Sequence, residues 1–261
     1  VCAIDQRVRI TATRLEARLL QIVSDIADPV EVPLDRFRVE GPMRFVLGAL
    51  VLYRGRLKHG LRLVITSQID PSLGLGSSAA VTIAMLGLLC EITDPETTAL
   101  TRKAGLHTTA LKLIRQLQGR GSGADLAASL HGGLLGYQLP ADLVDTTMLG
   151  LDAHSVCLAG LASETDCLSS DVGCAQIIAL PRPPQISLCY CGYKTPTGEV
   201  LASIAAKMQG HEAVFAALYS RMGSSALAAL CAAQQSDWHK FADHLNAYQS
   251  LMVELNVSDV T

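Results

Sequence analysis

Residues 71–81 read Pro-Ser-Leu-Gly-Leu-Gly-Ser-Ser-Ala-Ala-Val, and they join a predicted strand to a predicted helix. The preceding residues, Leu61 to Ile69, alternate apolar and polar side chains with the period of two that a half-buried strand has. The following residues form an apolar run of small side chains that ends near Glu91. The pattern therefore predicts a strand, a glycine-rich loop and a helix in direct succession.

The glycine-rich loop has the chemistry of a phosphate-binding site. Gly74 and Gly76 let the backbone approach oxygen atoms closely, and the start of a helix supplies amide donors and a positive dipole end. Ser77 and Ser78 add hydroxyl groups, and Ser78 is placed to give one oxygen ligand to a nucleotide-bound Mg²⁺. The string is neither the Walker nor the dinucleotide pattern. The alternative for a glycine loop of this kind is a plain turn with a helix cap.

A second segment, Gly121-Ser-Gly-Ala-Asp-Leu-Ala-Ala-Ser-Leu-His-Gly-Gly, also joins a glycine-rich turn to an apolar run. A carboxylate such as Asp125 can orient an attacking hydroxyl or phosphate and accept its proton while Mg²⁺ and backbone amides hold the phosphoryl charge. The alternative for Asp125 is an N-cap of the helix that runs to Leu130.

Together the two segments resemble the GHMP kinases, the superfamily that includes galactokinase, homoserine kinase, mevalonate kinase and phosphomevalonate kinase. The first resembles the family's central ATP-binding motif, which implies that its residues wrap the triphosphate. The second resembles the family pattern Ser-Gly-x-Asp-x-x-x-Ser-x-x-Gly-Gly, which implies that Asp125 is the catalytic base and Ser122 a substrate-binding residue. The implied nucleotide-binding residues are Pro71, Gly74, Leu75, Gly76, Ser77, Ser78 and Ala79.

A third segment, Gly192-Tyr-Lys-Thr-Pro-Thr-Gly-Glu-Val, resembles a region of phosphomevalonate kinases. The resemblance places the chain near the mevalonate and phosphomevalonate kinases. It implies that Lys194, Thr195 and Thr197 hold an acidic substrate, because a cation and short hydroxyl donors suit carboxylate or phosphate. The alternative is a capped helix start with a solvated lysine.

The chain departs from the family pattern in three places. It starts beyond the basic first loop of family members and stops before their last glycine-rich motif, so the C-terminal domain is expected to be incomplete. The position of a Mg²⁺-binding glutamate in mevalonate kinases is Ile114 in this chain. Metal coordination would then rest on Ser78, the phosphates and water.

The expected fold class is α+β, and the resemblance implies a two-domain GHMP kinase fold with the active site in the cleft between the domains. We expect an N-terminal half like domain 2 of ribosomal protein S5 and a helix-rich, ferredoxin-like C-terminal half. The predicted domains are residues 1–150, an irregular connection 151–183, and residues 184–261.

Periodicity predicts the elements outside the three motifs. Strands are expected at Val1 to Thr13 and Arg18 to Asp25, paired with each other, and at Ile186 to Tyr193. A helix is expected at Met43 to Tyr53. The other predicted elements are one or two helices over 95–118, a turn into a strand over 132–137, and helices from about 194 to 255.

Composition and charge limit the partners. The 261 residues carry a formal net charge of −3, with 21 basic and 24 acidic residues, so no broad field is expected that would gather nucleic acid or anionic membrane. Neither an uninterrupted apolar stretch of spanning length nor an export signal is recognised, which predicts a cytoplasmic protein. The expected partner is a small-molecule substrate, and a homodimer is compatible with the sequence.

The cysteines are interpreted as structural residues, and the histidines have both a structural and a functional interpretation. The eight cysteines are scattered through a chain whose core is already adequate, which predicts free buried thiols. A zinc site that uses Cys189 and Cys191 is disfavoured because no Cys-x-x-Cys occurs. His107 and His131 flank the Asp125 segment, where a role in proton or substrate handling competes with a structural one.

The predicted function is transfer of the γ-phosphoryl group of Mg-ATP to a small acidic acceptor, with mevalonate or phosphomevalonate favoured. Sugar and homoserine kinases share the glycine loop and remain alternatives. A third hypothesis is a non-catalytic protein of the same fold that binds a nucleotide or a partner, supported by the missing end motifs and by Ile114.

Overall fold

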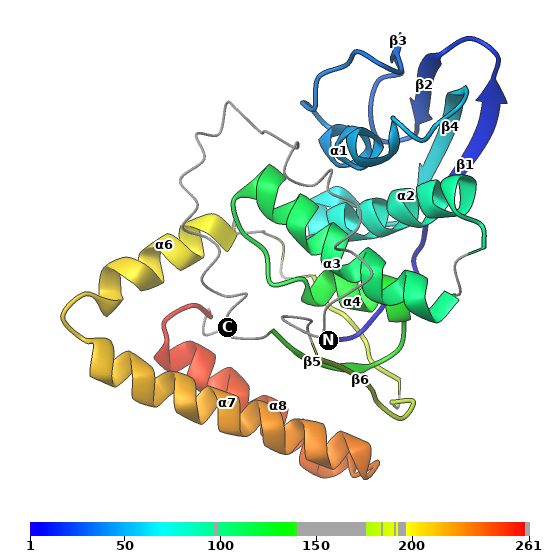
Figure 1. Ribbon diagram of the computed structural model, residues 1–261. Coiled ribbons are helices and arrows are strands. Elements are labelled where there is room, and N and C mark those ends of the chain that lie inside the picture. Colours follow the sequence, from blue (N-terminus) through cyan, green and yellow to red (C-terminus); the bar gives the residue numbers. More distant parts are fainter. Residues whose placement is uncertain (97–98, 140–175, 184, 191, 193–196, 259–261) are drawn as a thin grey trace. The chain divides into compact units, whose positions relative to one another are not determined.

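The computed structural model describes residues 1–96, 99–139, 176–183, 185–190, 192 and 197–258. The described chain divides into two compact units, Val1–Ile178 and Ala179–Thr261. Helices and strands occur together, and the α+β fold class is confirmed (Figure 1). The predicted connection over 151–183 lies mostly outside the described residues, and the predicted domain limits stay predictions.

The first unit contains a four-stranded sheet in the order β1-β4-β2-β3. Its strands are β1 (Val8–Leu15), β2 (Leu19–Ser24), β3 (Val30–Pro33) and β4 (Gly60–Ser67). β4 runs antiparallel to β1 and parallel to β2, while β3 is antiparallel to β2. The prediction that the first two strands pair with each other was wrong, because β4 lies between them.

The buried face of this sheet follows from alternation along the strands. Leu20 and Ile22 of β2 and Leu61, Leu63 and Ile65 of β4 are at most 5% exposed, whereas the residues between them on β4 are exposed. Because neighbouring side chains on a strand point to opposite faces, one face of the sheet is apolar and must be covered. The core cluster of this unit joins these strand residues to helix residues.

Four helices complete the first unit: α1 (Arg44–Tyr53), α2 (Ser77–Thr93), α3 (Ala99–Gln118) and α4 (Ala124–His131). α2 is central, because it contacts α1, α3, α4 and β1. Ala79, Met85, Leu86 and Leu89 of α2 are completely buried. The helix that follows the glycine-rich loop is therefore built into the core, which gives the loop a rigid base.

A two-stranded sheet pairs β5 (Leu135–Gln138) with β6 (Gln176–Ala179). The start of the chain lies beside the residues that lead into β5, through a bridge between Cys2 and Leu134. The first strand therefore covers Val8–Leu15 and not the predicted residues from Val1 onward.

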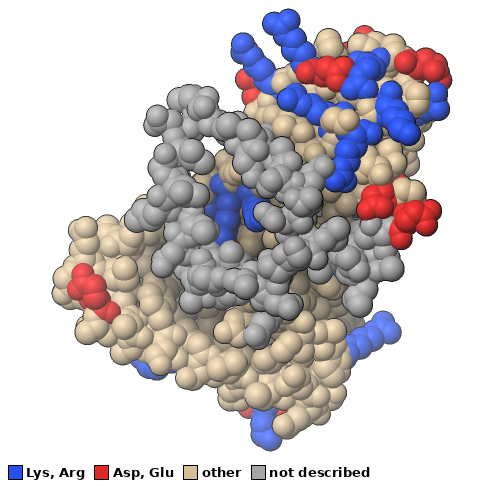
Figure 2. Space-filling view, viewed as in Figure 1, with Lys and Arg blue, Asp and Glu red and all other residues tan. Residues whose placement is uncertain are grey.

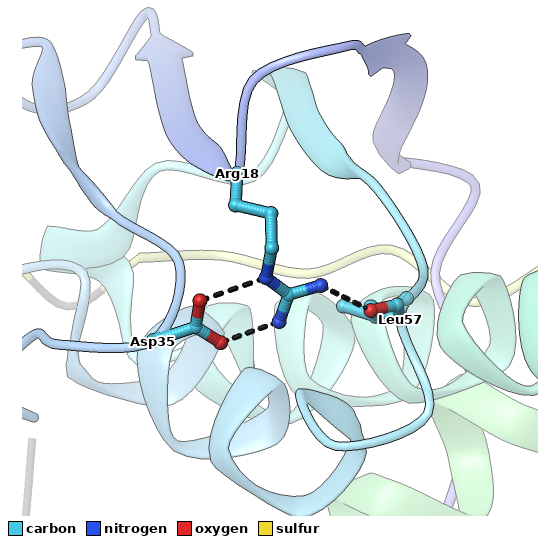
Figure 3. A network of polar contacts seen from close by, with 3 residues as sticks. All are labelled: Arg18, Asp35 and Leu57. Carbon is cyan, nitrogen blue, oxygen red and sulfur yellow. Dashed lines mark hydrogen bonds and ion pairs between the residues drawn. The ribbon is translucent and has the colours of Figure 1, made fainter.

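An arginine network joins three loops of the first unit (Figure 3). Arg18 lies between β1 and β2, and its guanidinium donates from Nε and from Nη2 to the Asp35 carboxylate, with 2.7 Å for the Nε contact. Nη1 donates to the backbone oxygen of Leu57 at 2.7 Å. The bidentate bond to Arg18 holds the pKa of Asp35 below its usual range.

The regular secondary structure of the second unit from residue 180 onward is helical in the part of the chain that the structure describes. It contains α6 (Thr197–Met208), α7 (Glu212–Gln234) and α8 (Trp238–Glu254), which confirms the predicted helix-rich character. α7 and α8 contact each other, and their small core consists of Leu218, Met222, Leu251 and Leu255. The strand predicted from Ile186 was wrong for the described residues 186–190, which have no regular secondary structure.

Two surface properties bear on the expected partners. Figure 2 shows Lys and Arg side chains, with Asp and Glu side chains among them, over the part formed by β1–β4 and α1. By length and composition alone, α7 is long and apolar enough to span a membrane. This criterion is looser than the uninterrupted apolar stretch that was sought in the sequence. Core helices of soluble proteins pass the same test, so this property alone is weak evidence.

The cysteines differ from expectation in one respect. Cys2, Cys90, Cys189 and Cys231 are free thiols, as predicted. None of these four is buried, so the prediction of buried thiols was wrong for the described part of the chain. Within that part there is also no cluster of three or more His, Cys, Asp or Glu side chains suited to a metal ion.

Candidate active site

The glycine-rich loop begins three residues after the end of β4. Asp70 caps the short 3₁₀ helix Pro71–Leu73. Its Oδ1 accepts hydrogen bonds from the Ser72 amide at 2.8 Å and from the Ser72 hydroxyl at 2.7 Å. These bonds lower the pKa of Asp70. The first half of the loop is thus held by its own side chains.

The second half of the loop is shaped by two glycines in the left-handed region. Gly74 has φ of 74° and Gly76 has φ of 77°. Residues with a side chain rarely adopt this conformation, so both positions favour glycine. Gly76 is the N-cap of α2, and the helix starts at Ser77. The first amide groups of α2 have no carbonyl partner within the helix, which makes this end suitable for an anion.

The two serines of the motif lie in the first turn of α2 and are half-buried. The backbone oxygen of Ser78 accepts a hydrogen bond from Thr82 Oγ1 at 2.7 Å, and Thr82 is completely buried. A buried hydroxyl stabilises this turn from the core side. The structure thus places Gly76, Ser77 and Ser78 together at the exposed end of a rigid helix, in agreement with the predicted loop.

The turn before α4 resembles the glycine-rich loop in its backbone. Gly123 has φ of 81° and is the N-cap of α4. Asp125 is the second residue of the helix and is exposed, and its Oδ1 accepts from the neighbouring Leu126 amide at 3.0 Å. The N-cap position belongs to Gly123, so Asp125 is not the cap that was considered as its alternative role.

The two motifs meet in space although they are far apart in the sequence. A methyl group at Gly76 would lie 3.5 Å from Cβ of Asp125, and α2 contacts α4 directly. The position of Gly76 and the Asp125 side chain are therefore neighbours in space. A carboxylate and a helix N-terminus with two serines are thus brought to one place on the first unit.

Three side chains support the turn before α4 from behind, and we call them the carbonyl clamp. Each donates a hydrogen bond to one of three consecutive backbone carbonyls. The pairs are Arg115 Nε with Gly121 O at 2.9 Å, Tyr137 Oη with Ser122 O at 2.6 Å, and His107 Nε2 with Gly123 O at 3.1 Å. Neither Arg115 nor Tyr137 was singled out from the sequence, because no spacing rule connects an α3 residue or a β5 residue to this turn.

Burial changes the acid–base properties of the clamp. Burial lowers the pKa of His107, and the bond to Gly123 and the charge of Asp125 offset part of that effect. Burial also raises the pKa of Tyr137 to about 12. Both side chains are therefore neutral near pH 7. For His131, burial followed by the charges of Lys103 and His107 lowers the pKa.

Ile114, where the resemblance to mevalonate kinases implies a Mg²⁺-binding glutamate, is part of the core. Its side chain is 5% exposed. A methyl group at Gly121 would lie 3.0 Å from Cγ2 of Ile114, so the isoleucine packs directly beneath the turn. An apolar side chain in this position supports the turn by packing and cannot bind a cation.

The third motif is only partly described. Lys194 and Thr195 lie outside the described residues, and Thr197 is the first residue of α6 in the second unit. Their predicted role in substrate binding stays a prediction, as does the predicted cleft between the two halves.

A cavity of about 430 Å³ lies beside β3 and α1, and residues 27–30 line part of it. The lining is mostly apolar and includes Val30, Phe37 and Met43.

Residues 44–133, which contain both glycine-rich motifs, match the family model of the GHMP kinases N terminal domain. This part of the chain is therefore similar to the GHMP kinases. The match begins at the first residue of α1 and ends just after α4, so it covers the elements that carry the site. The resemblance inferred from residues 71–81 and 121–133 is confirmed.

Similar proteins include mevalonate kinases. A mevalonate kinase from Pyrococcus abyssi is 34% identical over 119 residues, which are 45% of this chain and 34% of the relative. The match thus spans about one third of that relative's length.

Solved structures share the fold. The Lin0012 protein from Listeria innocua has a TM-score of 0.75 and 22% identity, with 96% of this chain and 70% of that chain covered. The phosphomevalonate kinase from Streptococcus pneumoniae, solved with phosphomevalonate and AMPPNP, has a TM-score of 0.67 and 16% identity, with 94% and 70% covered. The GHMP kinase fold expected for the chain is confirmed.

Proposed function

We propose that this protein transfers the γ-phosphoryl group of ATP to a small acidic acceptor, and that the acceptor is mevalonate or phosphomevalonate. The observation that supports the proposal best is the closeness of the two motifs, since a methyl group placed on Gly76 would lie 3.5 Å from Asp125 Cβ. Phosphoryl transfer needs phosphate-binding donors and a group that orients the acceptor within one site.

Each part of the site has a role in the proposed reaction. Amide groups at the start of α2, with the hydroxyls of Ser77 and Ser78, bind the phosphates of ATP. Asp125 lies beside the loop and is exposed, so it can accept the proton of the attacking hydroxyl or orient an attacking phosphate. Ser122 and, from the second unit, Lys194, Thr195 and Thr197 are proposed to bind the acidic part of the acceptor.

The residues fit a Mg²⁺ ion that arrives with the nucleotide. The Ser78 hydroxyl is one oxygen ligand at the start of α2, and Mg²⁺ accepts phosphates and water as the others. The bound ion would neutralise charge on the transferred phosphoryl group. The buried Ile114 adds no ligand, so the protein is expected to bind free Mg²⁺ weakly and Mg-ATP much more strongly.

The test is ADP release from Mg-ATP by the full-length protein with mevalonate, phosphomevalonate, galactose and homoserine supplied separately. We expect acceptor-dependent ADP with mevalonate or phosphomevalonate. Turnover with galactose or homoserine would retain the kinase and change its branch. ATP binding without turnover on any acceptor would favour a non-catalytic protein of this fold, the second candidate, which is supported by the apolar Ile114.

The role of Asp125 is tested by Asp125→Asn, which keeps size and shape and removes the charge. We expect kcat to fall by at least about 100-fold, because an amide cannot accept the acceptor's proton. The Kd for ATP should change little, and the protein should fold normally. An active Asp125→Asn variant would refute the assigned base.

The remaining proposals concern location and partners. We propose a cytoplasmic enzyme whose partner is its small-molecule substrate, with no role in binding nucleic acid or membranes. Sedimentation of the full-length protein tests whether it forms a homodimer.

A further inference from the structure

The carbonyl clamp converges on one short turn. Its members come from two elements that are separated in the sequence, with His107 and Arg115 on α3 and Tyr137 on β5. They bond to three consecutive carbonyls, from Gly121 to Gly123, at 2.6–3.1 Å. Because a carbonyl oxygen only accepts, Nε2 of His107 must carry the proton, which defines the tautomer of the imidazole.

The contact between clamp and turn is closely packed. His107 is 5% exposed, and its ring lies 5.8 Å from the Tyr137 ring, tilted by 56°. A methyl group at Gly123 would lie 3.0 Å from the Tyr137 hydroxyl and 3.4 Å from His107 Nε2. A side chain at Gly123 would therefore fit only if its neighbours moved by a few tenths of an ångström.

Fixing three carbonyls also fixes the start of α4. Each peptide group is planar, and in a trans peptide the carbonyl and the amide N–H point in opposite directions. Holding the carbonyls of three successive peptides thus orients the whole turn, which contains two glycines and would otherwise have high conformational freedom. Asp125 follows two residues after Gly123, and its direction is set by that turn.

We propose that His107, Arg115 and Tyr137 are positioning residues that hold Asp125 against the glycine-rich loop. This inference rests on the proposed function, because it assigns the clamp a share in phosphoryl transfer. The clamp itself touches the backbone and not the substrate. Its effect reaches the reaction through the 3.5 Å approach between the Gly76 position and Asp125 Cβ, where a small shift of α4 would withdraw the carboxylate.

The main experiment uses Tyr137→Phe, which removes one hydroxyl and keeps the ring against His107. We expect kcat to fall about tenfold while the Kd for ATP stays within about twofold, because misplacement of a reacting group affects chemistry more than binding. Tyr53→Phe is the matched control, since its hydroxyl lies 3.0 Å from Cys90 Sγ and outside the clamp. The control should keep its kcat. An unchanged kcat in Tyr137→Phe would overturn the proposal.

A double variant separates positioning from general damage. In the Asp125→Asn background, Tyr137→Phe should cause no further loss of kcat, because residues that act as a unit are not additive. A further tenfold loss in that background would show that Tyr137 acts independently of Asp125 and would overturn the proposal. His107→Gln should keep more activity than His107→Leu, because glutamine retains an N–H donor near the position of Nε2.

Amide hydrogen exchange gives a readout that does not depend on turnover. Tyr137→Phe should raise exchange in residues 121–126 and leave α1 unchanged. If the wild-type protein has no turnover with any acceptor, the proposed function fails, and the exchange measurement still decides whether the clamp holds the turn. Unchanged exchange in residues 121–126 would overturn the clamp itself.

Discussion

The two glycine-rich turns of the first unit look alike in sequence and are held in different ways. The loop before α2 is stabilised locally, by the Asp70 cap on Ser72 and by the left-handed conformations of Gly74 and Gly76. The turn before α4 is stabilised from a distance, by the three side chains of the carbonyl clamp. A loop that wraps a ligand needs an open outer side, whereas a turn that presents one carboxylate benefits from support on its inner side.

The largest expected effect on stability is at the turn before α4. Gly123→Ala places a methyl group 3.0 Å from Leu111 Cδ1 and from the Tyr137 hydroxyl, in a backbone with φ of 81°. Strain and overpacking together should lower the free energy of unfolding by about 2–4 kcal/mol, measured by urea denaturation. Gly41→Ala is the control, since it has φ of 70° and no neighbour within 4 Å, and it should cost less. Equal losses would mean that packing against the clamp contributes little.

A smaller loss of stability is expected at the loop before α2. Gly76 has φ of 77°, and the methyl group added by Gly76→Ala would meet only Asp125 Cβ at ordinary contact distance. The expected loss in the free energy of unfolding is therefore mainly backbone strain of about 1–2 kcal/mol. The Kd for ATP should rise about tenfold, because strain there moves the amides that bind phosphate. Calorimetric titration with ATP measures it. An unchanged Kd would indicate that this loop does not contact the phosphates.

The turn before α4 should also respond to pH, because one clamp residue titrates. Burial places the pKa of His107 below its ordinary value of about 6.5. The unfolded chain then binds more protons than the folded one as pH falls below about 6.5, so stability is full above that pH and declines below it. His107→Gln should flatten the profile between about pH 5 and 7 in urea denaturation. A wild-type profile that is already flat would show that burial of His107 does not lower its pKa.

The smallest effect is expected where a network lies on the surface of the first unit. Arg18→Met removes the bond that lowers the pKa of Asp35, so the stability it supplies is present above the ordinary pKa of Asp35 and is lost as pH falls through the lowered value. The melting temperature at pH 7 should fall slightly, since exposed ion pairs contribute little. The Kd for ATP should stay the same. A loss of ATP binding would connect this network to the site.

Much of the first unit follows from local patterns. The alternation in Leu61 to Ile69 and the apolar spacing in Met43 to Tyr53 predicted β4 and α1 within a few residues. Such patterns could not predict strand pairing, because alternation shows which face of a strand is buried and not which strand lies next to that strand. The parallel pairing of β2 with β4 therefore came as a correction.

In the candidate site, too, the sequence predicted the local segments and the tertiary structure showed how they meet. The string around Gly76 and the string around Asp125 were identified from residue types and from resemblance to a family. Their contact, and the roles of Arg115 and Tyr137, depend on how α2, α3, α4 and β5 pack. Hydrogen bonds from a side chain to a distant carbonyl have no signature in the order of residues, since any donor at the right place in space can make them.

By itself, the sequence of this protein indicated the resemblance to GHMP kinases, the fold class and the two turns that favour glycine, because local backbone conformation and phosphate chemistry depend on neighbouring residues. Only the tertiary structure decided that the two turns meet, that Ile114 lies in the core beneath one of them, and that three side chains hold the other. The physical reason is that these contacts join residues far apart in the chain, and their distances are set by the packing of helices around α2.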